Sequence, residues 1–233
     1  MIILGLDPSL RGFGWVLLDA DGISIVEKGL LSTDADMIFI DRYLYLREEL
    51  RKLVKKWGSY ADERGESFGI GIESPIFNDL YSEGMYGLFL YCNEVFKTES
   101  KDVVFLSPHQ VKAQAHEHLG RPKGWKMQKN DMVDAAKSSA GATHGAGGTK
   151  MNHHQADAYW VGRGAWKFWR VIEEVDGGKE LEEAIKVVGL SVVDEKQFTD
   201  VDLYLKGVKA GSVKRKGILY KESDRWFRWS KKI

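Results

Sequence analysis

Two short apolar runs of this chain each end in a carboxylate. Residues 2–6 are apolar, begin with two β-branched isoleucines and are followed by Asp7, while residues 68–72 form a similar apolar run followed by Glu73. Apolar runs of this length, bounded by turn-forming residues, predict β-strands. If the two strands are neighbours in one sheet, their carboxylates lie side by side at the edge where such sheets bind ligands.

Strand-like and helical patterns alternate along the chain. Further strands are predicted at 13–18, 23–28 and 103–106, and an Asp-Gly hairpin signal joins the first two into a three-strand meander with residues 2–6. Helical periodicity or capping residues predict helices at 40–57, 81–96, 108–119, 129–139 and 153–175. The alternation predicts an α/β fold, a mixed sheet flanked by helices.

The sequence changes character after Gly177-Gly178. A Glu/Lys-rich helical segment is followed by short strand-like pieces and an aromatic, basic tail. We therefore predict a main domain at 1–176 and a small α+β appendage at 177–233, whose fold the sequence leaves open.

The 34 basic and 34 acidic side chains balance in number but are unevenly placed. Residues 101–170 and 200–233 each carry six more basic than acidic side chains, and the other 129 residues carry twelve more acidic ones. Charge distribution matters more than net charge for binding polyanions, so a nucleic-acid partner is compatible with this composition.

The single cysteine, Cys92, excludes a disulfide framework and a cysteine-rich zinc site. It is expected to be a buried apolar thiol. Asp7 interrupts the apolar N-terminal segment before a signal peptide could form, and the longest apolar stretches are far short of the roughly 20 residues of a membrane helix. We expect a soluble, cytoplasmic protein of a bacterium or a phage-infected host.

A third acid, Asp157, lies three residues after His154 near the start of a predicted helix. Residues at this spacing share one helix face, so both can point at the edge that carries Asp7 and Glu73. Three carboxylates and an imidazole suit Mg²⁺ or Mn²⁺, and a pair of such ions is the common device for phosphodiester hydrolysis. The alternatives are a turn cap for Asp7, a solvent-exposed strand end for Glu73 and a surface charge for Asp157.

Five segments, taken in order and spacing, resemble the RuvC family of Holliday junction resolvases. They are Gly5–Trp15, Ile72–Glu73, Leu106–Lys112, Lys129–Val133 and His154–Ala158. The resemblance covers roughly residues 1–170 and implies a ribonuclease-H-like fold. It also implies a Mg²⁺-dependent endonuclease, with Mn²⁺ as a substitute, that cuts four-way or other branched DNA as a homodimer.

The resemblance implies roles for individual residues. Asp7, Glu73 and Asp157 would be the metal-binding acids, and His154 would occupy the fourth place, where many relatives have aspartate; His153 is the alternative if the alignment shifts by one. Lys112 and Lys129 align with family lysines near the scissile phosphate, where an ammonium group stabilises developing negative charge. The alternative for both lysines is a solvated helix charge.

The chain departs from the family pattern in three places. The basic segment 120–128 has no clear counterpart, and its Arg121, Lys123, Trp125 and Lys126 either form a solvent loop or clamp phosphates, with Trp125 stacking on a base. Phe77 is a candidate for the aromatic wedge of the family, although it lies one residue later than expected. The tail mixes cations and aromatics, which suits either a nucleic-acid surface or a small β core; this extended form resembles phage-encoded members.

These observations favour an endonuclease for branched DNA with DNA contacts from Lys112, Arg121, Lys123, Trp125, Lys126, Lys129 and Phe77. Helix 81–96, with Gly84 and Gly87, is either a dimer seam or ordinary core.

A catalytically silent junction-binding protein is a second hypothesis, although unneutralised carboxylates would repel phosphate. A nucleotide-binding lobe of the actin and Hsp70 type is a third, but 233 residues are too few for its two lobes. The sequence leaves open the preferred branched substrate, the sequence preference at the cut and any branch-migration partner.

Overall fold

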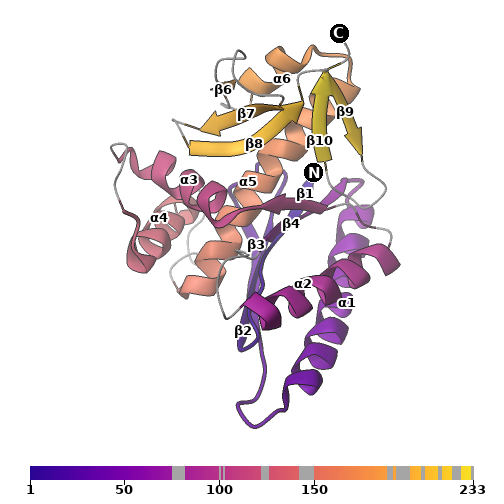
Figure 1. Cartoon of the computed structure of the whole chain (residues 1–233), viewed down its shortest axis with the longest axis vertical. Coiled ribbons are helices and arrows are strands. Elements are labelled where there is room, and N and C mark those ends of the chain that lie inside the picture. Colours follow the sequence, from indigo (N-terminus) through magenta and orange to yellow (C-terminus); the bar gives the residue numbers. More distant parts are fainter. Residues whose placement is uncertain are drawn as a thin grey trace.

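The computed structural model describes residues 1–74, 82–99, 101, 103–121, 126–141 and 150–187, together with the backbone of five strands between residues 191 and 231. A mixed sheet in the order β3-β2-β1-β4-β5 forms its centre (Figure 1). The strands are β1 (Ile2–Asp7), β2 (Gly12–Leu18), β3 (Ile25–Ser32), β4 (Phe68–Glu73) and β5 (Val103–Leu106). The first three form the expected antiparallel meander, and β1, β4 and β5 run parallel. The predicted α/β class is confirmed.

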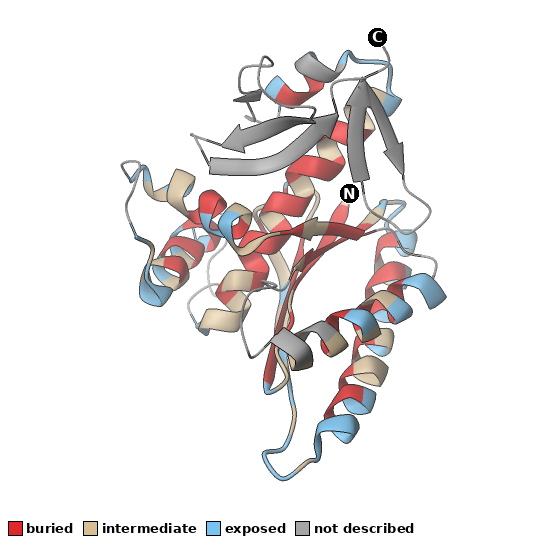
Figure 2. Ribbon diagram, viewed as in Figure 1, coloured by how far each residue is buried: buried red, intermediate tan, exposed pale blue. Residues whose placement is uncertain are grey.

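Helices cover both faces of this sheet. On one side lie α1 (Phe39–Glu63) and α2 (Ser82–Thr98), and on the other lies α5 (His153–Asp176) with α3 (Pro108–Leu119) and α4 (Lys129–Gly141) beside it (Figure 1). β1 is buried on both faces: Ile3 belongs to the core under α5, while Ile2, Leu4 and Leu6 belong to the core under α1 and α2. Figure 2 colours the strands at the centre of the sheet largely as buried. A strand that is buried on both faces reads as a continuous apolar run, as this one does.

Two helices begin at the predicted caps. Ser107 and Asn152 each form a capping box with the glutamine three residues later, Gln110 and Gln155, and Pro108 occupies the first turn of α3. Because such caps satisfy backbone amides that the helix leaves free, they set the starting points of α3 and α5. The starts of α4 and α2 also agree with the predicted ones within one residue.

Two of the boundaries that differ from the sequence prediction have a local explanation. The second hairpin strand begins at Ile25 because the Asp21 carboxylate accepts hydrogen bonds from the amides of Ile23 and Ser24, which holds these residues in the turn. α1 continues past Trp57 to Glu63 because Gly58 and Ala61 extend its buried face and Gly58 does not end the helix. Both differences arise from local contacts that apolar periodicity does not report.

α6 (Leu181–Val187) follows α5 after a turn at Gly177-Gly178. Its Ala184 and Ile185 are buried in the same core as α5. The first helix beyond the predicted boundary therefore packs on the main domain, and the division at residue 176 stays a prediction.

A second sheet follows in the order β6-β7-β8-β10-β9. Its strands are β6 (Ser191–Val192), β7 (Asp200–Leu205), β8 (Val208–Lys214), β9 (Gly217–Lys221) and β10 (Phe227–Lys231). In this sheet Trp229 is in register with both Val213 and Leu219. β8 lies close to α3, so the tail is adjacent to the main domain (Figure 1).

No helix in the described part of the chain is long and apolar enough to cross a membrane. Cys92 is buried in the core under α1 and α2, and burial raises the pKa of its thiol. The expectation of a buried apolar thiol is confirmed.

Candidate active site

Asp7 and Glu73 end two neighbouring parallel strands. In the register of β1 and β4, Leu6 lies opposite Ile72, so the next residues on the two strands are the two acids. Glu73 in turn lies opposite Leu106, the last residue of β5. The predicted arrangement, in which a shared sheet edge carries both carboxylates, is confirmed.

α5 brings the other two side chains to this edge because it crosses the sheet at very short range. A Cβ atom built on Gly5 would lie 2.2 Å from the carbonyl oxygen of Ala158 and 2.7 Å from the amide nitrogen of Gly162. Only glycine at position 5 permits this approach of helix backbone to strand backbone. Since Asp7 is two residues beyond Gly5, and Asp157 directly precedes Ala158, the crossing holds the two acids close together.

His154 forms a direct side-chain hydrogen bond with Asp7. Its Nδ1 lies 2.7 Å from Oδ2 of Asp7, and the side chains are 26% and 14% exposed, respectively. The neighbouring ring of His153 lies with its centroid 4.1 Å from that of His154. Of the two histidines considered from the sequence, His154 is therefore the one that contacts the acidic edge, and His153 lies beside it.

Two glycines of β2 lie under His154. A Cβ atom on Gly14 would lie 2.3 Å from the His154 carbonyl oxygen, and one on Gly12 would lie 3.2 Å from Cδ2 and 3.3 Å from Nε2 of the ring. Neither glycine was among the residues predicted for the site. Gly14 lies inside the predicted strand 13–18, and an interior strand glycine often marks the close approach of another backbone. Gly12 lies just before that predicted strand, in the expected turn, and carried no such signal.

The electrostatics of the site are those of a cluster of like charges. Burial, followed by repulsion from Asp157, raises the pKa of Asp7 well above its usual value. Burial raises the pKa of Glu73 in the same way, with added repulsion from Asp7 and Asp157. Burial also raises the pKa of Asp157 and lowers that of His154. The ionised acids therefore lack sufficient compensating positive charge within the protein.

Two lysines supply part of that positive charge. Lys129, the first residue of α4, lowers the pKa of Asp7 and Asp157, and Lys112 of α3 lowers that of Glu73 and Asp157. Both side chains are exposed. The two cations identified from the sequence thus lie within electrostatic reach of the acids and are open to solvent.

The remaining predicted DNA contacts fall into two groups. Arg121, two residues after the end of α3, and Lys126, three residues before α4, are both exposed. Lys123, Trp125 and Phe77 lie outside the described residues, so the clamp and the wedge stay predictions.

The donor set suits a hard cation, although the side chains do not form a preformed cage. In the part of the chain that is described, no group of three or more His, Cys, Asp or Glu side chains is arranged to hold a metal ion. One carboxylate oxygen of Asp7 is bonded to His154. A divalent cation would nevertheless stabilise these partly buried acids, whose pKa values are raised by burial and, for Asp7 and Glu73, also by neighbouring carboxylates. Oxygen donors are the ligands that Mg²⁺ prefers.

The sheet order, the helices on both faces and the acids at the strand ends define a ribonuclease-H-like α/β fold. Among solved structures, Thermus thermophilus RuvC in complex with a Holliday junction substrate aligns with a TM-score of 0.54 at 12% identity, over 72% of this chain and 96% of that one. A second structure of Thermus thermophilus RuvC aligns with the same TM-score, at 14% identity. The predicted fold class is confirmed.

The chain is RuvC-like in sequence as well as in fold. It is 36% identical to the crossover junction endodeoxyribonuclease RuvC of Ruminiclostridium cellulolyticum over 80 residues, which are 34% of this chain and 43% of that protein. Its similarity to the enzyme of the same name from Gluconobacter oxydans is weaker, at 26% identity, but covers 64% of this chain and 98% of that protein. No protein-family model matches the chain.

The stronger matches are partial. The chain spans less than half the length of the relatives to which it is at least 36% identical, those of Ruminiclostridium cellulolyticum, Gluconacetobacter diazotrophicus and Sphingopyxis alaskensis. The resemblance predicted from five short segments is nonetheless confirmed.

Proposed function

We propose that this chain is a metal-dependent endonuclease that cuts branched DNA, with the four-way junction as its principal substrate. The observation that carries the proposal is the partly buried cluster of Asp7, Glu73 and Asp157 joined by His154 at one sheet edge. The names of the RuvC relatives, and the Holliday junction bound to one structural neighbour, support the same reaction. We assign the chemistry to residues 1–176.

In this proposal Asp7, Glu73, Asp157 and His154 hold Mg²⁺, for which Mn²⁺ can substitute. The bound ions would supply an activated water and stabilise the leaving 3′-oxygen of the cleaved phosphodiester. The raised pKa values support this role: burial and then repulsion from Asp157 raise that of Asp7, and burial and then repulsion from Asp7 and Asp157 raise that of Glu73. A bound cation would stabilise such partly buried carboxylates.

The other groups have roles that follow from their positions. Lys112 and Lys129 would bind the scissile phosphate, since both are exposed and both act electrostatically on the acids. When the Asp7 carboxylate accepts from the Nδ1–H of His154, the Nε2 atom carries the free lone pair. That nitrogen would then serve as the ligand or as the acceptor that orients the attacking water.

DNA would continue from the site onto the basic segment after α3. Arg121 and Lys126 are exposed there, and the sequence adds Lys123 and Trp125 between them. A row of cations that contacts phosphates makes affinity strongly dependent on salt, so binding to this surface should weaken steeply as salt is added. Phe77 is retained as the candidate wedge.

Paired cleavage of a junction needs two active sites, and we propose a homodimer that uses the outer surface of α1 and α2. The space beside Gly84 and Gly87 is filled by side chains of α1. A Cβ atom added at Gly84 would lie 2.6 Å from Phe39, and one added at Gly87 would lie 2.9 Å from the Tyr43 hydroxyl. The glycine pair therefore favours packing of α2 on α1 over a seam between two copies.

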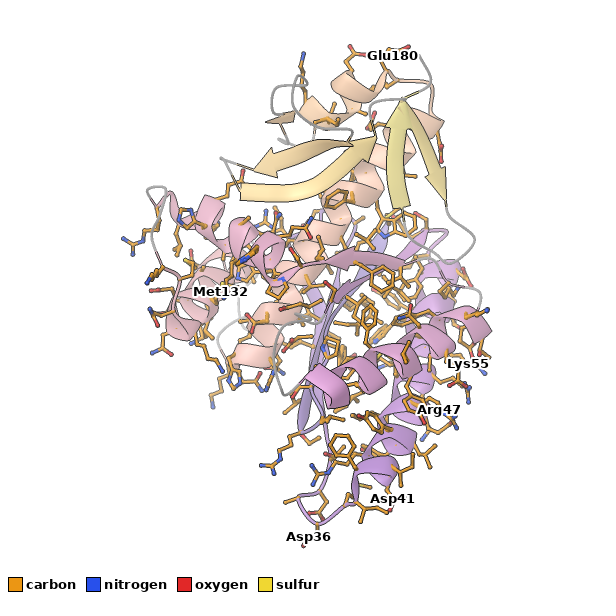
Figure 3. The ribbon with its side chains drawn as sticks, in the orientation of Figure 1. Asp36, Asp41, Arg47, Lys55, Met132 and Glu180 are labelled. Carbon is orange, nitrogen blue, oxygen red and sulfur yellow. The ribbon has the colours of Figure 1, made fainter. Side chains whose placement is uncertain are left out.

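The exposed apolar side chains Leu44 and Leu90 are better candidates for the contact between copies. They are 40% and 54% exposed, and each lies one turn before the Arg47–Glu94 ion pair that links the two helices. Figure 3 labels Asp41 and Arg47 on this stretch of α1. A shared exposed face with large aliphatic side chains is a reasonable surface for a second copy.

Cleavage of labelled four-way junction, fork, flap and plain duplex in Mg²⁺ and in Mn²⁺ tests the proposal. We expect paired symmetric nicks in the four-way junction, and we expect Asp7→Asn and Asp157→Asn to lose the nicks while they keep junction binding. Cleavage mainly of forks or flaps would keep the chemistry and reject the four-way junction as the substrate. Binding without cleavage in either metal would favour the catalytically silent junction-binding protein.

A further inference from the structure

We propose that Gly12 is a positioning residue for His154: because it has no side chain, the imidazole can rest on β2 with Nδ1 held by Asp7 and Nε2 on the side that Asp7 does not engage. The inference rests on the proposed function for its catalytic consequence, but the position of the ring can be measured without any cleavage.

The imidazole of His154 lies between Asp7, which binds it, and Gly12, against which it packs. On one side Nδ1 is 2.7 Å from Oδ2 of Asp7. On the other side a Cβ atom at Gly12 would lie 3.2 Å from Cδ2 and 3.3 Å from Nε2, which is tighter than most contacts of real Cβ atoms. A methyl group at position 12 would therefore push the ring by a few tenths of an ångström, at the nitrogen that Asp7 does not engage.

Gly12 differs in this respect from its neighbour Gly14. A side chain at Gly14 would collide with helix backbone, since the Cβ atom would lie 2.3 Å from the His154 carbonyl oxygen. The three atoms nearest to a Cβ at Gly12 would be Cδ2 and Nε2 of the His154 ring and, at 3.7 Å, one methyl carbon of Leu30. Gly14 thus allows the backbone of α5 to pass close to β2, whereas Gly12 contacts the imidazole ring itself.

The backbone of Gly12 does not need glycine. The residue is the first of β2 and is paired with Ser32 across the hairpin, and it is not among the glycines with positive φ. Alanine at such a position lowers the conformational entropy of the unfolded chain and tends to stabilise the fold. Gly12→Ala is therefore expected to keep or raise the melting temperature while it disturbs the site, a combination that a purely structural role would not produce.

The decisive experiment is a double-mutant cycle on junction cleavage. We expect Gly12→Ala to lower the single-turnover rate on the order of tenfold, because small misplacements of a catalytic group reduce rates strongly. In the His154→Ala background the same change should have no further effect, since the two sites act through one ring. Gly58→Ala is the matched control, because a Cβ at Gly58 meets nothing closer than 3.4 Å, and it should leave the rate unchanged.

Two measurements do not depend on cleavage. Imidazole ¹H–¹⁵N spectra of the metal-free protein, with the His154 signal assigned by its loss in His154→Ala, should show shifted Nδ1 and Nε2 resonances in Gly12→Ala and unshifted ones in Gly58→Ala. Titration with Mn²⁺ alone, followed by electron paramagnetic resonance, should show weaker binding in Gly12→Ala than in the wild type.

Several outcomes would overturn the proposal. Equal slowing by Gly12→Ala with and without the His154 side chain would assign its effect to the backbone, and an unshifted His154 signal would show that the ring does not rest on Gly12. If the wild type cleaves no substrate but the His154 signal moves in Gly12→Ala, the proposed function fails while the positioning holds. The two hypotheses are therefore separable.

Discussion

The two faces of the central sheet are packed in different ways. Under α5, the strand residues include Gly5, Gly69 and Gly71, and at each of them an added Cβ would lie within 3 Å of α5. Under α1 and α2, the same strands present large aliphatic side chains, including Leu4, Ile70 and Ile72. The glycine face brings a helix backbone close enough to deliver two site residues, whereas the aliphatic face supplies ordinary core packing.

The strongest test of this difference is Gly5→Ala. The new Cβ would lie 2.2 Å from the Ala158 carbonyl oxygen, so α5 would have to move away from β1. Overpacking of this kind against backbone should destabilise the fold by about 3 kcal/mol or more. Urea unfolding measures the effect, and a wild-type midpoint would show that the crossing is looser than described.

A core truncation on the opposite face should affect stability alone. Leu46 of α1 is 1% exposed, and Leu46→Ala should lower the free energy of unfolding by about 2 to 3 kcal/mol through lost burial and the cavity left behind. Cleavage per folded molecule, measured well below the melting temperature, should stay near the wild-type rate because α1 carries no site residue. A large loss of activity in the folded variant would contradict the division between the two faces.

Replacing Asp7 by asparagine should stabilise the metal-free protein at neutral pH. Burial raises the pKa of Asp7 in the folded protein, so the ionised carboxylate is disfavoured there. The free energy of unfolding that comes from this raised pKa is therefore present at acidic pH and is lost as the pH rises through the pKa of the folded state. In metal-chelating buffer at neutral pH, Asp7→Asn should therefore be more stable than the wild type by about 1 kcal/mol.

The pH dependence supplies the control for that variant. Below the ordinary pKa range of aspartate, the wild-type carboxyl is protonated, and the stability difference from Asp7→Asn should vanish. Thermal unfolding from acidic to neutral pH would measure this. A variant that is less stable than the wild type at every pH would mean that the hydrogen bond to His154 outweighs the repulsion.

The smallest effect on stability is expected on the outer surface of α1 and α2. Leu44→Glu and Leu90→Glu should each change the free energy of unfolding by less than about 0.5 kcal/mol, because both side chains are exposed. They should nevertheless dissociate the proposed dimer and abolish paired nicks in the junction. Sedimentation velocity distinguishes the outcomes: an unchanged mass would place the contact between copies on another surface.

Much of this architecture follows from local sequence patterns. Ser107, Pro108 and Asn152 set the starts of α3 and α5, the Asp-Gly pair marks the hairpin, and the apolar runs before Asp7 and Glu73 are both strands. These features can be read because each depends on residues within a few positions of one another. The same is true of the shared helix face of His154 and Asp157.

The position of that helix face against the sheet could not be read in this way. His154 and Asp7 are 147 residues apart, and their contact depends on how closely α5 approaches β1 and β2 at Gly5, Gly12 and Gly14. The pattern of alternating apolar residues identifies which strands are buried but not the distance of closest approach, because that distance is set by residues that lack side chains. The acids were therefore identifiable from the chain alone, while the hydrogen bond that orients the imidazole, and the glycine beneath it, required the tertiary structure.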